Sequence, residues 1–459
     1  MGSLTTSQPL IPSARRLMKS LRDLGYDFSA AVADVIDNSI TAGGNIIAID
    51  VEFDGDHSKV RIADNGIGMS RDQLQEAMRY GSERDYLDDE LGKFGLGLKT
   101  ASLSQCRRLT VASRVKNGEI CAFCWDLEHV EITDRWELII PSGKDLDNIL
   151  GGHLSEETGT VVYWQNLDRM LGLKHPYGET SKNRLRSLSR ELETHIAMVF
   201  HRFLNGEVLG MKLKITLNDD NVLEPWDPFA RDQEDTKCLD PVVYHLKHED
   251  ISGDVILIPY ILPTQDRFKP LSAFEQASGP KKWNQQQGFY IYRANRLIQS
   301  GGWCNLRAVD EHTKLARIAL DFSPQLDEAF NINVAKMRVQ LPEEIRDQID
   351  ETTAGIVAKA REIYDKKDRP KPPPTIIPTP SSSQVPPTGK PSTEILPAAA
   401  IETVGKPESE DRNLLAQNMW TVDDFQLMLE GNTYRDEMRV LTRIIKRLRK
   451  KLDDYKRRH

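Results

Sequence analysis

The first residues that could take part in chemistry are a carboxylate and an amide four positions apart. Asp34 and Asn38 lie in a stretch with helical character from Ser29 to Ile40, and this spacing places both on one helix face. Together they could orient water and a hydrated Mg²⁺, which takes few protein ligands and prefers oxygen. Taken alone, this pattern is more typical of a polar surface face.

A glycine turn, ADNGIGM, follows a predicted strand and spans Ala63 to Met69. The carboxylate of Asp64, at the strand end, could accept a hydrogen bond from an exocyclic amine. Gly66 and Gly68 permit unusual backbone angles and the close approach of a ligand. By itself, an Asp-Asn-Gly sequence indicates only a turn.

A second glycine-rich segment, GKFGLGLKT, runs from Gly92 to Thr100 and precedes a sequence compatible with a helix. Backbone N–H groups ahead of a helix can hold phosphate, and the helix dipole and Lys99 would add positive potential. The segment is not a P-loop, because GxxxxGK[ST] is absent. In isolation it does not identify a phosphate site.

In this order, the three segments resemble the GHKL ATPases, named after gyrase, heat-shock chaperone, histidine kinase and MutL. Members of that superfamily carry E-x-x-x-N, then D-x-G-x-G, then a lid ending in G-x-x-G-x-G, then a strand with G-T. Here the last element is Thr158-Gly159-Thr160. The resemblance implies a Bergerat-type α/β sandwich, with helices on one face of a mixed sheet, that binds ATP and Mg²⁺.

Carried over residue by residue, the resemblance implies that Asn38 binds Mg²⁺ and that Asp64 reads the adenine amine, with Thr160 beside it. Asp34 falls where the family usually has Glu as the general base. Since Asp is one methylene shorter and geometry decides whether a base reaches its proton, ATP binding is expected but fast hydrolysis is not. The turn and the lid would supply the other nucleotide contacts, at Gly66, Gly68, Met69, Gly92, Lys93, Phe94, Gly95, Leu96, Gly97, Leu98, Lys99 and Thr100.

The resemblance extends over residues 12–345 and is greatest to MORC-type ATPases and their prokaryotic relatives. ITLNDDNVLEPWDPF and GFYIYRANRLIQSGGW are similar to the transducer domain of that family. NINVAKMRVQLP places Lys336 where members send a lysine to the γ-phosphate, a catalytic role. The CW-type zinc module of many eukaryotic members is not found, which favours a prokaryotic-type relative.

The predicted elements and the composition divide the chain into four parts. An ATP-binding domain is expected over residues 1–170 and an α+β transducer domain over 171–369. Residues 370–410 are rich in Pro, Ser and Thr, which predicts a disordered linker. From Tyr434 to Tyr455, apolar residues recur four and three apart, which predicts a coiled-coil helix within residues 411–459.

Charge is concentrated at the C-terminal end. The net charge is −8, yet Arg443 to Arg458 contains nine basic and two acidic residues. This basic row could contact DNA phosphates, act as a nuclear signal, or keep a helix soluble.

Five scattered cysteines indicate no disulfide framework, and Cys121 and Cys124 lie in a strand-like segment, which favours ordinary strand cysteines over a zinc site. No apolar run approaches the roughly 20 residues that cross a bilayer. The chain lacks a secretory signal at its start, so a cytoplasmic location is expected.

These features favour a Mg²⁺-dependent ATPase whose heads dimerise when ATP binds and that clamps or compacts DNA, in genome silencing or defence against foreign DNA. The coiled coil could also hold a permanent homodimer. A scaffold that binds ATP with little turnover and recruits an effector protein is the main alternative, and a chaperone is another. A sensor histidine kinase is disfavoured, since neither a membrane segment nor a phosphoacceptor-histidine helix is recognisable.

Overall fold

The computed structural model describes most of the chain up to residue 367. The described ranges are 11–23, 26–81, 97–154, 158–171, 175–218, 221–249, 251–332 and 339–367, all within one compact unit, Met1–Pro374. The expectations for Gly92, Lys93, Phe94, Gly95, Leu96 and Lys336, for the linker and for the coiled coil therefore lie outside the described residues.

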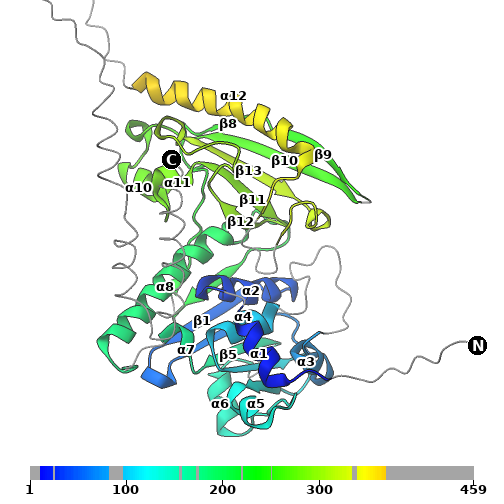
Figure 1. Cartoon of the computed structure of the whole chain (residues 1–459). Helices are drawn as coiled ribbons and strands as arrows, with labels where there is room; N and C mark the ends of the chain where they lie inside the picture. The colour runs from blue at the N-terminus through cyan, green and yellow to red at the C-terminus, as the bar shows by residue number, and fades with distance from the viewer. Residues whose placement is uncertain are drawn as a thin grey trace, which may run out of the picture. The chain divides into compact units, whose positions relative to one another are not determined.

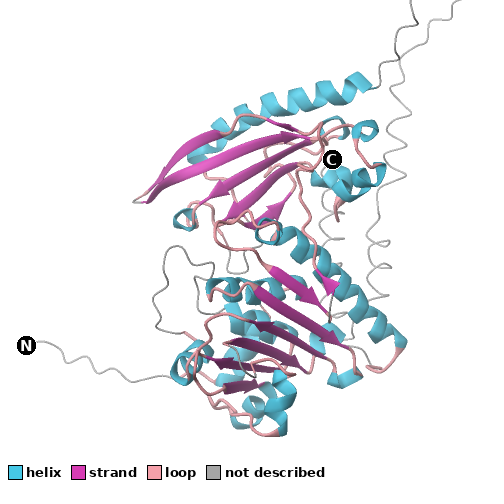
Figure 2. Ribbon diagram, turned by 180° about the vertical axis from the view of Figure 1, so that it is seen from behind, coloured by secondary structure: helices cyan, strands magenta, loops and turns pink. Residues whose placement is uncertain are grey.

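A mixed sheet of seven strands dominates the first part of the described chain (Figures 1 and 2). The strand order is β4-β3-β5-β2-β1-β6-β7; β1 and β6 are parallel and the other neighbours antiparallel. The strands are β1 Ile46–Glu52, β2 Lys59–Asp64, β3 Arg108–Arg114, β4 Cys121–Asp126, β5 Gly159–Gln165, β6 Lys214–Leu217 and β7 Asn221–Val222.

Most helices of this part cover one face of the sheet, as expected, and α6 packs on the other, since alternate strand residues point to opposite sides. Val111 and Val162 belong to a large core shared with α1, α2, α4 and α8, whereas their neighbours Ala112 and Val161 belong to a smaller core that Ile149 of α6 closes. The helices are α1 Ala14–Arg22, α2 Phe28–Thr41, α3 Arg71–Met78, α4 Gly97–Gln105, α5 Leu127–Thr133, α6 Lys144–Leu150, α7 Asp168–Leu171 and α8 Glu179–Val199, with the 3₁₀ turn η1 Gly55–His57.

Helix α2 carries the Asp34–Asn38 pair and confirms the helix expected over Ser29 to Ile40. Asp27 caps it by accepting a hydrogen bond from the Ala30 N–H at 2.7 Å, which satisfies one of the open donors of the first turn. Most of its side chains are buried, including those of Asp34, Asp37 and Ser39, whereas Asn38 is exposed.

The first sheet extends beyond residue 170, where we expected the transducer domain to begin. Strand β6 pairs in parallel with β1, and core residues continue through Leu223. Helix α8 is followed by α9 His201–Leu204, with Phe200 between them.

A second sheet, also mixed, follows in the order β12-β11-β13-β10-β8, with β9 paired to β10. Helix α12 packs on it through Ile345, Ile349 and Ala360 (Figure 1). The predicted fold class, an α/β sandwich followed by an α+β domain, is confirmed. The remaining elements are β8 Lys237–Cys238, β9 Val242–His248, β10 Ile251–Ile261, β11 Gly288–Arg293, β12 Arg296–Ser300, β13 Ala316–Phe322, α10 Leu271–Ser278, α11 Lys282–Gln286, α12 Glu343–Lys367, and the 3₁₀ turns η2 Gln265–Arg267, η3 Glu311–Thr313 and η4 Pro324–Leu326.

Cys121 and Cys124 lie in strand β4, as predicted. Across the described ranges, none of the helices combines the length and apolar character that a membrane span requires.

Candidate functional site

The carboxylate of Asp64 is fixed by three hydrogen bonds at the end of β2. Oδ1 accepts from the backbone N–H of Gly66 at 2.9 Å and of Thr160 at 3.2 Å, and Oδ2 accepts from the Ser39 hydroxyl at 2.9 Å. Burial raises the pKa of Asp64 above its ordinary value, and the three bonds only partly oppose this effect. The side chain is therefore a half-buried, oriented acceptor.

The turn after Asp64 accepts no side chain at its two glycines. A Cβ on Gly66 would lie 2.9 Å from the carbonyl oxygen of Ala42, and one on Gly68, whose φ is +70°, would lie 1.9 Å from that of Arg114. Glycine is therefore required at both positions, because the turn passes close to the end of α2 and to β3.

Ser113 of β3 ties this turn to the strand that carries Thr160. Its hydroxyl accepts from the Met69 N–H at 2.8 Å, lies 2.8 Å from the Gly159 carbonyl oxygen and 2.9 Å from Oγ1 of Thr160. Strand register explains the meeting, because Ser113 and Thr160 are opposite each other and Thr160 is opposite Asp64.

Sequence reasoning missed Ser39 and Ser113. The position of Ser39, directly after Asn38 in the motif, was a usable signal. Ser113 gave none, because a single serine in a strand has no distinctive spacing.

Asp34 and Asn38 differ in exposure although both belong to α2. Asp34 is 4% exposed, whereas Asn38 is exposed. Oδ2 of Asp34 lies 3.7 Å from the position of a Cβ on Gly97, the first residue of α4. The structure thus places the expected base, Asp34, beside the end of the lid and leaves the expected Mg²⁺ ligand, Asn38, exposed to solvent.

An arginine distant in sequence lies beside two acidic residues of α2, Asp34 and Asp37. Arg296 of β12 places Nε 2.9 Å from Oδ1 of Asp37 and Nη2 3.6 Å from Oδ1 of Asp34. Nothing in the local sequence around Arg296 pointed to this contact.

Lys99, expected near phosphate, is 2% exposed and donates from Nζ to the carbonyl oxygen of Ala77 at 2.8 Å, on α3. Its ammonium group lies 5.8 Å from the centre of the Tyr80 ring, and burial lowers its pKa to about 8. Thr100 is buried beside it, and Leu98 packs against the large core.

The described residues fit ATP and Mg²⁺. Asp64 offers a half-buried, oriented acceptor suited to an amine, and Asn38 offers an exposed amide oxygen one helical turn from Asp34. Within the ranges that the structure covers, no three His, Cys, Asp or Glu side chains form a metal cluster. Mg²⁺ suits a site with so few protein ligands, since it keeps several waters and binds substrate phosphates.

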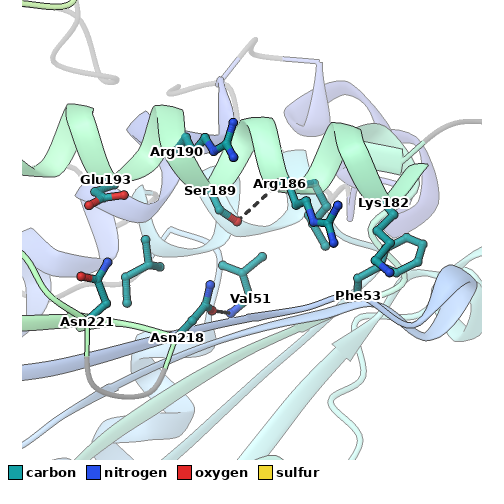
Figure 3. Close-up of a pocket in the computed structure, with 11 residues that line it drawn as sticks. Val51, Phe53, Lys182, Arg186, Ser189, Arg190, Glu193, Asn218 and Asn221 are labelled. Atoms are coloured by element: carbon teal, nitrogen blue, oxygen red, sulfur yellow. Dashed lines mark hydrogen bonds between the residues drawn. The ribbon is translucent and has the colours of Figure 1, made fainter. Parts of the chain in front are cut away.

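A separate groove of about 510 Å³ lies between α8 and the strands β1 and β6. Lys182 and Phe53 stand at one end of it and Glu193 and Asn221 at the other (Figure 3). Three cations from α8 line it, at Lys182, Arg186 and Arg190.

Residues 26–158 match the family described as "Histidine kinase-, DNA gyrase B-, and HSP90-like ATPase". This segment contains Asp34, Asn38, Asp64 and the glycine lid, so the predicted ATPase superfamily is confirmed for it.

Among curated proteins, the chain is similar to the DNA mismatch repair protein MutL of Haemophilus influenzae (strain PittGG), with 26% identity over 204 residues, which are 40% of this chain and 30% of that protein. MutL of Pasteurella multocida (strain Pm70) is 37% identical over 91 residues, 19% of this chain and 15% of that protein. The chain therefore spans less than a third of these relatives.

A solved structure described as "Crystal Structure of N terminal domain of a DNA repair protein" is 16% identical, with a TM-score of 0.45, and the alignment covers 77% of this chain and 98% of that one.

Proposed function

Since residues 26–158 form an ATPase domain of the histidine kinase-, gyrase B- and HSP90-like superfamily, we propose that this chain is a Mg²⁺-dependent ATPase whose heads pair when ATP is bound and that it clamps or compacts DNA. The single observation that carries the ATPase proposal is the arrangement around α2. Asp64 is an oriented acceptor at one end of the helix, and Asp34 faces the lid end at Gly97.

Each residue has a defined task in this proposal. Asp64 accepts a hydrogen bond from the adenine amine, and the turn at Gly66 and Gly68 lets the backbone approach the nucleotide. Asn38 would hold Mg²⁺, which would supply charge neutralisation on the phosphates. Asp34 orients and deprotonates the attacking water.

We expect slow turnover, because Asp34 is one methylene shorter than Glu and belongs to a helix whose position the surrounding core fixes. The same observation favours the second candidate, a scaffold that binds ATP with little hydrolysis and recruits an effector. Asp34→Asn separates the two: loss of a measurable wild-type rate supports the ATPase, whereas a wild-type rate at background supports the scaffold.

The groove beside α8 supports contact with DNA. Lys182, Arg186 and Arg190 recur every four residues and so lie about 6 Å apart along the helix axis, in a chain whose net charge is −8. The curated relatives are DNA mismatch repair proteins. Phosphates would be neutralised here without reading of base sequence.

Charge reversal tests this groove. Arg186→Glu should weaken DNA binding and reduce the slope of log affinity against log salt by about one, since one phosphate contact is lost. Arg184→Glu is the matched control, because Arg184 is exposed on the same helix and does not line the groove. Equal loss in both variants would mean that only net charge matters.

The dimer, the MORC-type assignment and the role in silencing or defence belong to the same proposal. They rest on the sequence resemblance in the transducer segments. Analytical ultracentrifugation with a non-hydrolysable ATP analogue tests the dimer, and a protein that stays monomeric when saturated with the analogue refutes it.

A further inference from the structure

The turn between β11 and β12 places a hairpin against the nucleotide-binding half. Ala294 and Asn295 have φ of +47° and +67°, the two-residue type I′ geometry that matches strand twist. Such angles disfavour a residue with a Cβ, yet Ala294 holds them while packing against the large core of the first sheet. The tertiary contact thus outweighs the local preference.

Arg296, the residue after this turn, ends among the acidic side chains of α2. It is 3% exposed. Its guanidinium lies 2.9 Å from Oδ1 of Asp37 and 3.6 Å from Oδ1 of Asp34, and 5.9 Å from the ring centre of Phe200. The second sheet therefore supplies a cation to the helix that carries the expected base.

The charges in this cluster need such a cation. Asp34 and Asp37 are 4% and 0% exposed, and two buried carboxylates one turn apart repel each other. A guanidinium has five donors in a planar fork and can serve both. His195 of α8 does not take this role at neutral pH, because burial and the nearby Arg296 lower its pKa to about 4.

The two oxygens of Asp34 face different partners. Oδ1 is directed to Arg296, and Oδ2 lies toward Gly97 at the end of the lid. Arg296, whose Nε lies 2.9 Å from Oδ1 of Asp37, thus lies on the Oδ1 side of Asp34, while Oδ2 lies toward Gly97.

We propose that Arg296 is a positioning residue that orients Asp34 for water activation. Hydrolysis then depends on the packing of the β11–β12 hairpin against the core of the first sheet. This inference rests on the proposed ATPase function. Arg296 acts through Asp34, so its loss should affect the chemical step more than nucleotide binding.

The test compares ATP hydrolysis and binding of a non-hydrolysable analogue in four full-length variants. Arg296→Met removes the cation at similar volume, and Arg296→Lys keeps it. Arg296→Met/Asp37→Asn also removes one buried charge, which should recover folding stability without restoring the contact with Asp34. Arg293→Met is the matched control: Arg293 is buried in the same hairpin, and its ion pair with Asp327, at 2.7 and 2.8 Å, does not involve α2.

We expect Arg296→Met to lower kcat by about 10- to 100-fold, within the usual contribution of a general base, with KM and analogue affinity within about threefold of the wild type. The double variant should regain thermal stability but not kcat, and Arg296→Lys should regain part of kcat. Arg293→Met should lose stability and keep kcat.

Three results would overturn the inference. If the double variant regains kcat together with stability, Arg296 serves folding alone. If Arg296→Met turns over normally while Asp34→Asn is inactive, the ATPase stands and only the positioning role fails. A wild-type enzyme with no turnover refutes the ATPase itself, and the inference with it.

Discussion

Replacement of Asp64 by Asn changes one atom of the candidate adenine site and should separate stability from binding. Oδ1 accepts from two backbone N–H groups, of Gly66 and Thr160, so the amide oxygen must keep that position. The amide nitrogen then takes the place of Oδ2. Ser39 can accept from it and direct its own hydroxyl proton to the carbonyl oxygen of Val35, 3.2 Å away.

In Asp64→Asn, the second N–H of the amide nitrogen would then face the adenine amine, and both of these groups are donors. Loss of a hydrogen bond to a charged group costs about 1.5–3 kcal/mol, and a buried donor left unpaired costs about 1–3 kcal/mol more. A total of about 3–5 kcal/mol corresponds to a roughly 10²- to 10⁴-fold higher Kd for ATP. GTP should lose less, because its ring carries a carbonyl oxygen at that position.

The folding stability of Asp64→Asn should rise at neutral pH, although its affinity for ATP falls. Burial raises the pKa of Asp64 from its ordinary 3.8, so the folded state loses stability as the pH rises from 3.8 through the raised value. Asp64→Asn lacks this loss, and the unliganded variant should be the more stable protein at neutral pH. Its advantage should shrink as the pH falls through that window.

Calorimetric titration with non-hydrolysable ATP and GTP analogues, together with urea unfolding at several pH values, measures both effects. A variant that binds ATP as tightly as the wild type would refute the assigned role of Asp64. A variant that is less stable at neutral pH would refute the account of its burial. Equal loss for both nucleotides would point to a damaged pocket instead.

Three further predictions concern the framework of the site. Gly68→Ala should destabilise the fold by about 2 kcal/mol or more, since its Cβ would meet the Arg114 carbonyl at positive φ; unchanged thermal unfolding would contradict this. Ser113→Ala should cost about 1–3 kcal/mol in urea unfolding, because the Met69 N–H loses its acceptor; a neutral effect means another acceptor replaces it. The pKa of His195 falls from 6.5 to about 4 in the folded protein, so folding stability should decrease as the pH drops from 6.5 to 4, by about 1.4 kcal/mol per pH unit. In His195→Gln, the dependence of unfolding free energy on pH should be weaker over this range. An unchanged dependence would mean that another group causes it.

Local sequence sufficed for the elements that carry the motifs. Helix α2 follows from an Asp27 cap and a run of small and apolar residues, and β2 and β5 from their β-branched composition. Asp64 stands at the strand end where it was expected, and Asn38 is exposed as a Mg²⁺ ligand must be. Such features depend on neighbours within a few positions.

The sequence did not indicate contacts that side chains and strands make with distant partners. Lys99 has the charge and spacing of a phosphate ligand, yet the fold holds its ammonium group on the Ala77 carbonyl. The sheet continues past residue 170 because β6 can pair with the open edge of β1.

By itself, then, the sequence determined which residues could bind a nucleotide, because motif order and residue type are local properties. Only the tertiary structure decided which of these residues contact one another. Ser113 reaches the turn through the register of β3 on β5, and Arg296 reaches Asp34 from more than 250 residues away through a hairpin packed on another core. Contacts across that separation depend on strand pairing and on the burial of charge, and neither leaves a spacing pattern in the chain.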